Sequence, residues 1–249
     1  MPATPKRRSA NPKKGRESDP WATATAHLSA VDDSLAALIE RIGACLLAPR
    51  PDRFGTLVRA IIGQQISSKA AAAIDARLRA LAGEPHRPGP IVALGEERLR
   101  EVGLSRTKAQ YVLNLANAVA TGEAPLDDFD RWTDEEIVAC LTAIKGIGPW
   151  TAEMFLIFAL NRPDVLPVGD LGVRAALRDR FGLAELPKPR ACHELAEIWR
   201  PYRSIAIWYL WQGLNTPAAD ATAPKKAEKP AVKLNPKARP QPARRSTKS

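Results

Sequence analysis

Apolar residues recur every three or four positions along most of the chain from residue 21 to residue 214, which is the period of an α-helix with one buried face. The clearest stripe lies in FGTLVRAIIGQQIS at 54–67. Similar periods follow in RTKAQYVLNLANAVA, TDEEIVACLTAI, LGVRAALRDRFGL and the unusually aromatic YRSIAIWYLWQGL. No long alternation of apolar and polar residues indicates a half-buried strand. The pattern therefore predicts an all-α fold with short connections.

Several element boundaries are marked by capping and turn residues. Thr133 and Glu136 stand at capping-box spacing, and Gly182 is placed to end the helix that begins after Asp170. Ser67 or Ser68 is placed to cap a helix. The Gly/Pro-rich segment at 83–90 predicts a loop, and the prolines at 162–170 exclude helix there. The expected apolar faces hold Ala71, Ile74, Leu78 and Leu81 in one helix and Tyr111, Leu113, Leu115 and Val119 in the next.

Charge divides the chain into three parts. Residues 1–18 hold six basic residues and one acidic residue, and residues 216–249 hold nine and two, so these segments carry +12 whereas 19–215 carries −2. Both terminal segments have little to bury, which is typical of disorder. We expect one helical domain at 19–215 between a disordered basic N-terminal tail at 1–18 and a disordered basic tail rich in Ala, Pro and Lys at 216–249. Such tails add salt-sensitive attraction to nucleic acid or act only as solubilising extensions.

Composition also excludes several classes of protein. No segment approaches the ~20 apolar residues of a membrane-spanning helix, and the N-terminus lacks the apolar region of a secretory signal. We therefore expect a cytoplasmic protein without a membrane partner. Cys45, Cys140 and Cys192 are odd in number and far apart, which favours buried thiols over a disulfide framework or a metal site. The absence of a P-loop and of HExxH argues against nucleotide-driven and zinc chemistry.

The segment LTAIKGIGPWTAEMFL at 141–156 places two glycines and a proline between two helical faces. Glycine and proline inside a helix cost about 1 and 3 kcal/mol relative to alanine, so the spacing predicts a helix, a tight turn and a second helix over about 139–160. Pro149 suits the first turn of the second helix. Bare backbone amides at a helix N-terminus suit a phosphate, but a plain αα-hairpin needs the same turn. The spacing alone leaves both interpretations open.

Four motifs occur in the order that one family shows. IKGIGPWTA resembles the helix-hairpin-helix signature, and LPVGD provides a Gly/Pro-rich link to an aspartate, Asp170. GQQIS at 63–67 and PYRSIAIWYLW at 201–211 are the other two motifs. From about residue 50 to 215 the chain resembles the helix-hairpin-helix base-excision DNA glycosylases, and within them the alkylated-base branch, DNA-3-methyladenine glycosylase II. The resemblance implies a two-lobed helical fold and a nucleoid-associated monomer that acts on double-stranded DNA containing alkylated bases.

The resemblance also assigns the chemistry to particular positions. Asp170 would stabilise an oxocarbenium-like sugar and orient water, although an aspartate before a helix also serves as an N-cap. The pocket for the flipped base would be lined by Trp150, Trp208, Tyr209 and Met154. Aromatic residues on an apolar helix more often pack in a core, and Trp211 is open to either role.

Further positions would hold the DNA itself. By resemblance these are Gln64, Gln65, Ser67, Gly146, Gly148 and Thr151, with Gln65 a candidate to fill the gap that the flipped base leaves. A glutamine pair after a glycine is otherwise an ordinary polar turn. The backbone carbonyls of Thr142, Ile144 and Gly146 would bind a structural Na⁺ or K⁺ ion, and no cofactor is expected for catalysis.

The departures from the family pattern narrow the reaction. Relatives that also cut the strand carry a nucleophilic lysine two residues after the second glycine of the hairpin, where this chain has Trp150, while Lys145 precedes both glycines. The cysteines cannot supply a four-cysteine iron-sulfur cluster, and no N-terminal β domain is expected. The resemblance implies a monofunctional glycosylase. The alternatives are a glycosylase for another lesion, such as uracil, hypoxanthine, ethenoadenine or an oxidised purine, and a noncatalytic DNA-binding module.

Overall fold

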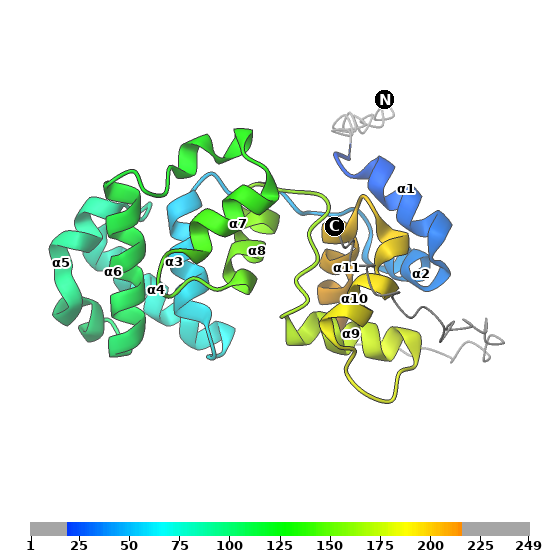
Figure 1. Cartoon of the computed structure of the whole chain (residues 1–249). Helices are drawn as coiled ribbons and strands as arrows, with labels where there is room; N and C mark the ends of the chain where they lie inside the picture. The colour runs from blue at the N-terminus through cyan, green and yellow to red at the C-terminus, as the bar shows by residue number, and fades with distance from the viewer. Residues whose placement is uncertain (1–18, 216–249) are drawn as a thin grey trace, which may run out of the picture. The chain divides into compact units, whose positions relative to one another are not determined.

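A computed structural model describes residues 19–215, and this part of the chain is helical and contains no strand. Its helices pack in two groups (Figure 1). The hairpin lobe consists of α3 (Arg53–Gly63), α4 (Ser68–Ala82), α5 (Pro88–Glu101), α6 (Arg106–Ala120), the 3-10 turn η1 (Leu126–Arg131), α7 (Asp134–Thr142) and α8 (Pro149–Phe158). The terminal lobe consists of α1 (Ala22–Val31), α2 (Asp33–Ile42), α9 (Leu171–Phe181), α10 (Pro189–Leu195), the 3-10 turn η2 (Glu197–Trp199) and α11 (Arg203–Asn215). The predicted all-α, two-lobed fold is confirmed.

The terminal lobe is assembled from both ends of the described chain, because α1 and α2 pack against α11 and α11 packs against α9. Buried polar contacts hold these distant segments together. The carboxylate of Asp32 accepts a hydrogen bond of 2.8 Å from the indole of Trp199 and forms an ion pair with Arg180. Two extended segments, 43–52 and 159–170, connect the two lobes. The second of these segments delivers the chain to Asp170.

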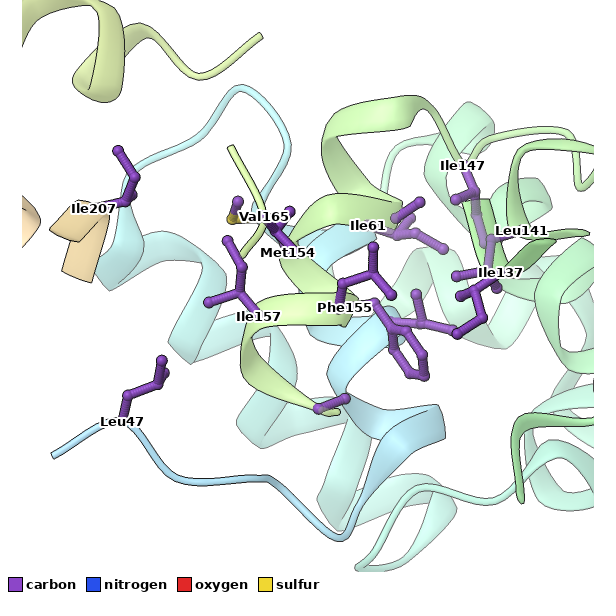
Figure 2. Close-up of a cluster of buried hydrophobic side chains, with 14 of the residues drawn as sticks. Leu47, Ile61, Ile137, Leu141, Ile147, Met154, Phe155, Ile157, Val165 and Ile207 are labelled. Carbon is purple, nitrogen blue, oxygen red and sulfur yellow. The ribbon is translucent and has the colours of Figure 1, made fainter. Parts of the chain in front are cut away.

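The core of the hairpin lobe lies where α3 and α7 pack against α8. Figure 2 shows Ile61 of α3, Leu141 of α7 and Phe155 of α8 among its buried side chains. Phe155 also meets the ring of Phe129 edge to face, with centroids 5.9 Å apart. This packing stabilises α8 along most of its length, so the turn that precedes the helix is held on a rigid support.

Most of the expected boundaries hold. The capping box is present, since Thr133 Oγ1 accepts from Glu136 N at 3.2 Å and Glu136 Oε2 accepts from Thr133 N at 2.8 Å. Ser67 caps α4, and Gly182 ends α9 in the left-handed conformation. The predicted loop at 83–90 is shorter than expected, because α5 begins at Pro88. A proline at the first helical position loses no hydrogen bond, so Pro88 is compatible with the start of a helix.

The buried face of α6 differs from the expected one. Its buried residues are Ala109, Val112, Leu115, Ala116 and Ala118. The larger Tyr111 and Leu113 are only half-buried. Tyr111 thereby becomes available to support the hairpin.

Three further expectations concern the chain as a whole. The disordered tails predicted at 1–18 and 216–249 lie outside the described residues. Within 19–215 no helix is long and apolar enough to cross a lipid bilayer. Cys45, Cys140 and Cys192 are free thiols, and Cys45 and Cys192 are buried.

Candidate active site

Asp170 is held at the point where the link between the lobes becomes α9. Its backbone N–H donates to Pro167 O at 2.9 Å, which closes the turn made by LPVGD. Its side-chain Oδ1 accepts from Val173 N at 2.8 Å and caps the helix. The sequence left open whether Asp170 is an N-cap or a catalytic carboxylate. The two roles are compatible, because the cap uses only Oδ1 and not Oδ2.

Two tryptophans complete the surroundings of this carboxylate. The indole Nε1 of Trp150, in the first turn of α8, donates to Asp170 Oδ2 at 2.9 Å. The indole Nε1 of Trp211, on α11, lies 3.4 Å from Asp170 Oδ1. Hydrogen bonds from N–H donors to an ionised carboxylate are stronger than neutral ones, so this arrangement stabilises a negative charge at a fixed position. The site thus combines α8, α9 and α11 from both lobes.

An aromatic stack orients Trp211. The ring of Phe158 lies nearly parallel to the indole of Trp211, with centroids 5.7 Å apart and an angle of 22°. The guanidinium carbon of Arg50 lies 5.0 Å from the centroid of the Phe158 ring. Sequence reasoning left Trp211 between a pocket role and a core role, and its contact with Asp170 places it at the site. The sequence signal for this placement was the spacing of three residues between Trp208 and Trp211, which makes the two side chains neighbours on the surface of α11.

The other three predicted pocket residues are less exposed. Met154 and Trp208 retain 7% and 8% of their surface, and Tyr209 retains none. The Tyr209 hydroxyl donates to Gly43 O at 2.8 Å, and its ring meets Trp208 edge to face. A residue without exposed surface cannot stack on a base, so Tyr209 is corrected from a pocket residue to a support for Trp208. Met154 belongs to the apolar cluster of Figure 2, while Trp208 keeps a small exposed edge.

A second carboxyl group lies near Asp170. Glu153 occupies α8 three residues after Trp150, is half-buried, and its side chain makes no hydrogen bond or ion pair within residues 19–215. Burial, and then the nearby negative charge of Asp170, raise the pKa of the Glu153 carboxyl to about 7. The sequence analysis did not single out this residue. Its signal was one acidic residue within the apolar run PWTAEMFLIF, which has no obvious structural use.

The hairpin turn has two glycines with different environments. Gly146 has φ +111°, and a Cβ there would lie 2.2 Å from the ring of Tyr111, so backbone and packing both require glycine. Gly148 has φ −95° and open space around a Cβ. Gly148 also begins α8 without any side-chain cap, so the first amides of that helix remain available to an anion.

The two glutamines of the α3–α4 turn have different environments too. Gln64 Nε2 donates to Gly146 O and to Thr151 Oγ1, both at 3.3 Å, so Gln64 ties this turn to the hairpin. Gln65 is exposed and has φ +57°. This left-handed conformation costs roughly 1–2 kcal/mol for a residue with a Cβ. Ser67 is exposed and its hydroxyl is used to cap α4.

The carbonyl groups suggested for a structural cation lie at the end of α7 and in the turn. The Ile144 carbonyl accepts from Ile147 N at 3.0 Å, and the Gly146 carbonyl accepts from Gln64. Each carbonyl oxygen has a second lone pair, and Thr142 is the last residue of α7, where the helix dipole favours a cation.

A separate depression of about 410 Å³ lies at the start of α3 and is not part of this site. Its lining includes Asp52, Asp127 and Asp128 and none of the residues around Asp170. Arg53 is the one basic residue among the described residues that line it.

Comparison with known families identifies the family to which the hairpin and its surroundings belong. Residues 58–201 match the model of the family described as "HhH-GPD superfamily base excision DNA repair protein". The chain belongs to this superfamily. The matched region contains both glutamines, the hairpin and Asp170, whereas the partner tryptophan Trp211 lies just beyond it.

Individual members of the HhH-GPD superfamily match most of this chain in sequence or fold. The chain is 36% identical over 213 residues to DNA-3-methyladenine glycosylase 1 of Schizosaccharomyces pombe, covering 82% of this chain and 91% of that protein. It is 30% identical over 171 residues to DNA-3-methyladenine glycosylase 2 of Escherichia coli, covering 64% and 57%. A solved structure of the S. pombe 3-methyladenine DNA glycosylase in complex with abasic DNA superposes with a TM-score of 0.71 at 34% identity, covering 79% and 98%.

Proposed function

We propose that the protein is a monofunctional DNA glycosylase that hydrolyses the N-glycosidic bond of alkylated purines, such as 3-methyladenine and 7-methylguanine. The observation that carries this proposal is the carboxylate of Asp170, held by the indoles of Trp150 and Trp211 in a superfamily of base-excision repair proteins. The names of its relatives support an alkylated purine as the substrate. The product would be an abasic site, which is also what the S. pombe relative holds in its complex.

The reaction needs the target nucleotide outside the DNA duplex, because stacked and paired bases are out of reach. A purine alkylated at N3 or N7 is cationic, so it leaves as a neutral base with the electron pair of the glycosidic bond. Water adds to C1′ of the sugar and loses a proton. Asp170 stabilises the positive charge that develops on the sugar and orients this water. Its fixed hydrogen bonds avoid reorganisation during the reaction.

The aromatic side chains select the base. A cation over an indole face gains about 1–2 kcal/mol once it is desolvated. Trp150 and Trp211 are the two indoles adjacent to Asp170, so they place a cationic ring next to the carboxylate. Trp150 has no amine to form a Schiff base with the sugar, and Lys145 is an exposed residue on the other side of the glycines. The enzyme therefore releases the base without cutting the strand.

The DNA backbone is held at the hairpin and the α3–α4 turn. The uncapped amides of Gly148, Trp150 and Thr151 at the start of α8 suit a phosphate next to the lesion, whereas Pro149 has no N–H. Gln65 projects from the turn in an energetically costly conformation, which suits a side chain that fills the gap left by the flipped base. A Na⁺ or K⁺ ion on the carbonyls of Thr142, Ile144 and Gly146 would add positive charge near that phosphate. Replacing Na⁺ and K⁺ in the buffer by choline should lower the melting temperature of the protein if one of these ions binds there.

We place the enzyme in the cytoplasm on the nucleoid as a monomer, with double-stranded DNA containing alkylated bases as its partner. Size-exclusion chromatography with light scattering measures the mass of the free protein and of its DNA complex. A mass near one 27.1 kDa chain would agree with a monomer, and a twofold mass would contradict it.

The deciding experiment measures base release from methylated duplex DNA for the wild type and for Asp170→Asn. We expect the wild type to release 3-methyladenine and to leave a strand that breaks only after alkali. Equal rates for the two proteins would disprove the role of Asp170, and binding without release would indicate a noncatalytic module. Strand cleavage without alkali would contradict the monofunctional assignment.

A further inference from the structure

One face of α6 supports both segments that are assigned to DNA. Lys108, Tyr111 and Asn114 follow each other at intervals of three residues on this helix. The Tyr111 ring lies against the backbone of Gly146. Asn114 Nδ2 donates to Lys145 O in the hairpin at 3.0 Å. Lys108 contacts the other segment, the turn between α3 and α4.

The ammonium group of Lys108 closes the C-terminal end of α3. Its Nζ donates to Ile62 O at 2.8 Å and to Gln64 O at 2.6 Å. The last carbonyls of a helix have no partner within the helix, and a cation is favoured at this end by the helix dipole. Burial lowers the pKa of Lys108, while the two carbonyls supply hydrogen bonds to its charged form. Half-buried and doubly bonded, this ammonium is committed to the protein backbone.

These contacts fix Gln64 at both of its ends. Lys108 binds the backbone carbonyl of Gln64, while the side-chain amide of Gln64 reaches Gly146 O and Thr151 Oγ1. The next residue, Gln65, has φ +57° and is exposed. A residue with a Cβ persists in that conformation only when its surroundings impose it. The peptide that joins Gln64 to Gln65 contains the carbonyl that Lys108 holds.

We propose that Lys108 is a positioning residue for base flipping, whose ammonium holds the Gln64–Gln65 peptide so that Gln65 points into the space left by the flipped base. The proposal rests on the proposed function, because only an enzyme that flips a base needs such a plug. Lys108 does not touch the reacting atoms and acts through Gln65. Its removal therefore impairs the flipping step and leaves the hydrolysis at Asp170 intact.

Lys108→Met tests this role, since methionine keeps an unbranched apolar stem and removes the three N–H donors. Single-turnover release of 7-methylguanine is compared in two duplexes, one with the lesion opposite cytosine and one with it opposite an abasic analogue. An unpaired lesion costs less to flip. Relative to the wild type, we expect Lys108→Met to release the paired lesion about tenfold or more slowly. Its rate on the unpaired lesion should fall by less than about threefold, because that lesion costs less to flip.

The matched control is Lys69→Met, which removes the same charge from an exposed position in the first turn of α4. It should change both rates equally and by little. The double variant Lys108→Met/Gln65→Ala should lose less rate than the two single losses combined would give, because both residues act on the flipping step. Equal losses of Lys108→Met on both duplexes, full additivity, or the same selective loss in Lys69→Met would each overturn the proposal. If the wild type released no base from either duplex, the proposed function would fail, and the role of Lys108 with it.

Discussion

The indole of Trp150 donates a hydrogen bond of 2.9 Å to Asp170 across the junction of the two lobes. Trp150 lies in the first turn of α8 and Asp170 is the N-cap of α9, so this contact joins the N-terminal ends of two helices that belong to different lobes. Under the proposed function, the indole that would face the cationic base also fixes the carboxylate that would stabilise the cationic sugar. One side chain would then link recognition of the base to placement of the catalytic group.

Trp150→Phe separates these two roles, because phenylalanine keeps an aromatic face and lacks the N–H donor. A hydrogen bond to a charged group contributes about 1.5–3 kcal/mol, so we expect the single-turnover rate to fall roughly tenfold to a hundredfold if the bond acts fully in the transition state. The concentration of DNA at half-maximal rate should change little. A weakened affinity with an unchanged rate would show that Trp150 acts only as a wall of the pocket.

Asp170→Asn and Asp170→Ala separate catalysis from helix capping. Asparagine caps helices as well as aspartate, so Asp170→Asn should melt close to the wild type while losing at least about 100-fold in rate. Asp170→Ala should lose the same activity and also about 1 kcal/mol of unfolding free energy. Urea denaturation followed by circular dichroism measures the second effect. Similar stability of the two variants would argue against the N-cap seen at Oδ1.

Gly146→Ala should lower the stability of the protein, whereas Gly148→Ala should weaken DNA binding. Gly146→Ala places a Cβ 2.2 Å from Tyr111 at φ +111°, so it should destabilise the fold, by about 1–3 kcal/mol. Gly148→Ala meets no atom and should melt like the wild type, while its methyl group obstructs the DNA backbone and weakens binding. Thermal melts paired with fluorescence-anisotropy titrations would reveal both. Normal DNA binding by a folded Gly148→Ala variant would move the phosphate site elsewhere.

Glu153 should make stability depend on pH. Its pKa in the folded protein is about 7, above the ordinary value of 4.5, so the folded state favours the protonated form. The stability that Glu153 contributes is then fully present below about pH 4.5 and is lost as the pH rises to about 7. Glu153→Gln should remove this loss and melt about 2–4 °C above the wild type at pH 8, for an effect near 1 kcal/mol after allowance for partial exposure.

The control for this prediction is Glu97→Gln, since Glu97 is exposed on α5 and makes no ion pair within residues 19–215. Melting temperatures of the three proteins are compared between pH 4.5 and pH 8. A constant difference between Glu153→Gln and the wild type over this range would show that the Glu153 carboxyl does not titrate there.

Local chemistry explains why much of the fold was predictable. The Thr133–Glu136 capping box and the cap at Asp170 each depend on residues within three positions of each other, so their spacing in the sequence is sufficient. The start of α5 at Pro88 was missed because proline is compatible with either a loop or a first helical turn. Periodicity also gave too much weight to Tyr111 and Leu113 on α6, where three alanines are buried together with Val112 and Leu115.

The candidate site was harder to predict, because it is assembled from contacts between distant segments. The helix α11 carries apolar residues around most of its circumference, so its period does not distinguish Trp208, Tyr209 and Trp211. Only tertiary packing shows that Tyr209 reaches Gly43 while Trp211 reaches Asp170. Nothing in the sequence pointed to a role for Lys108, since a lysine on an amphipathic helix is ordinarily exposed to solvent.

The two hairpin glycines answer to different structural demands. Folding alone enforces Gly146, because Tyr111 occupies the space of any side chain there. Nothing in the free protein enforces Gly148, where a Cβ would meet open space at an ordinary φ. Under the proposed function, the requirement for glycine at 148 therefore comes from the bound DNA and not from the fold.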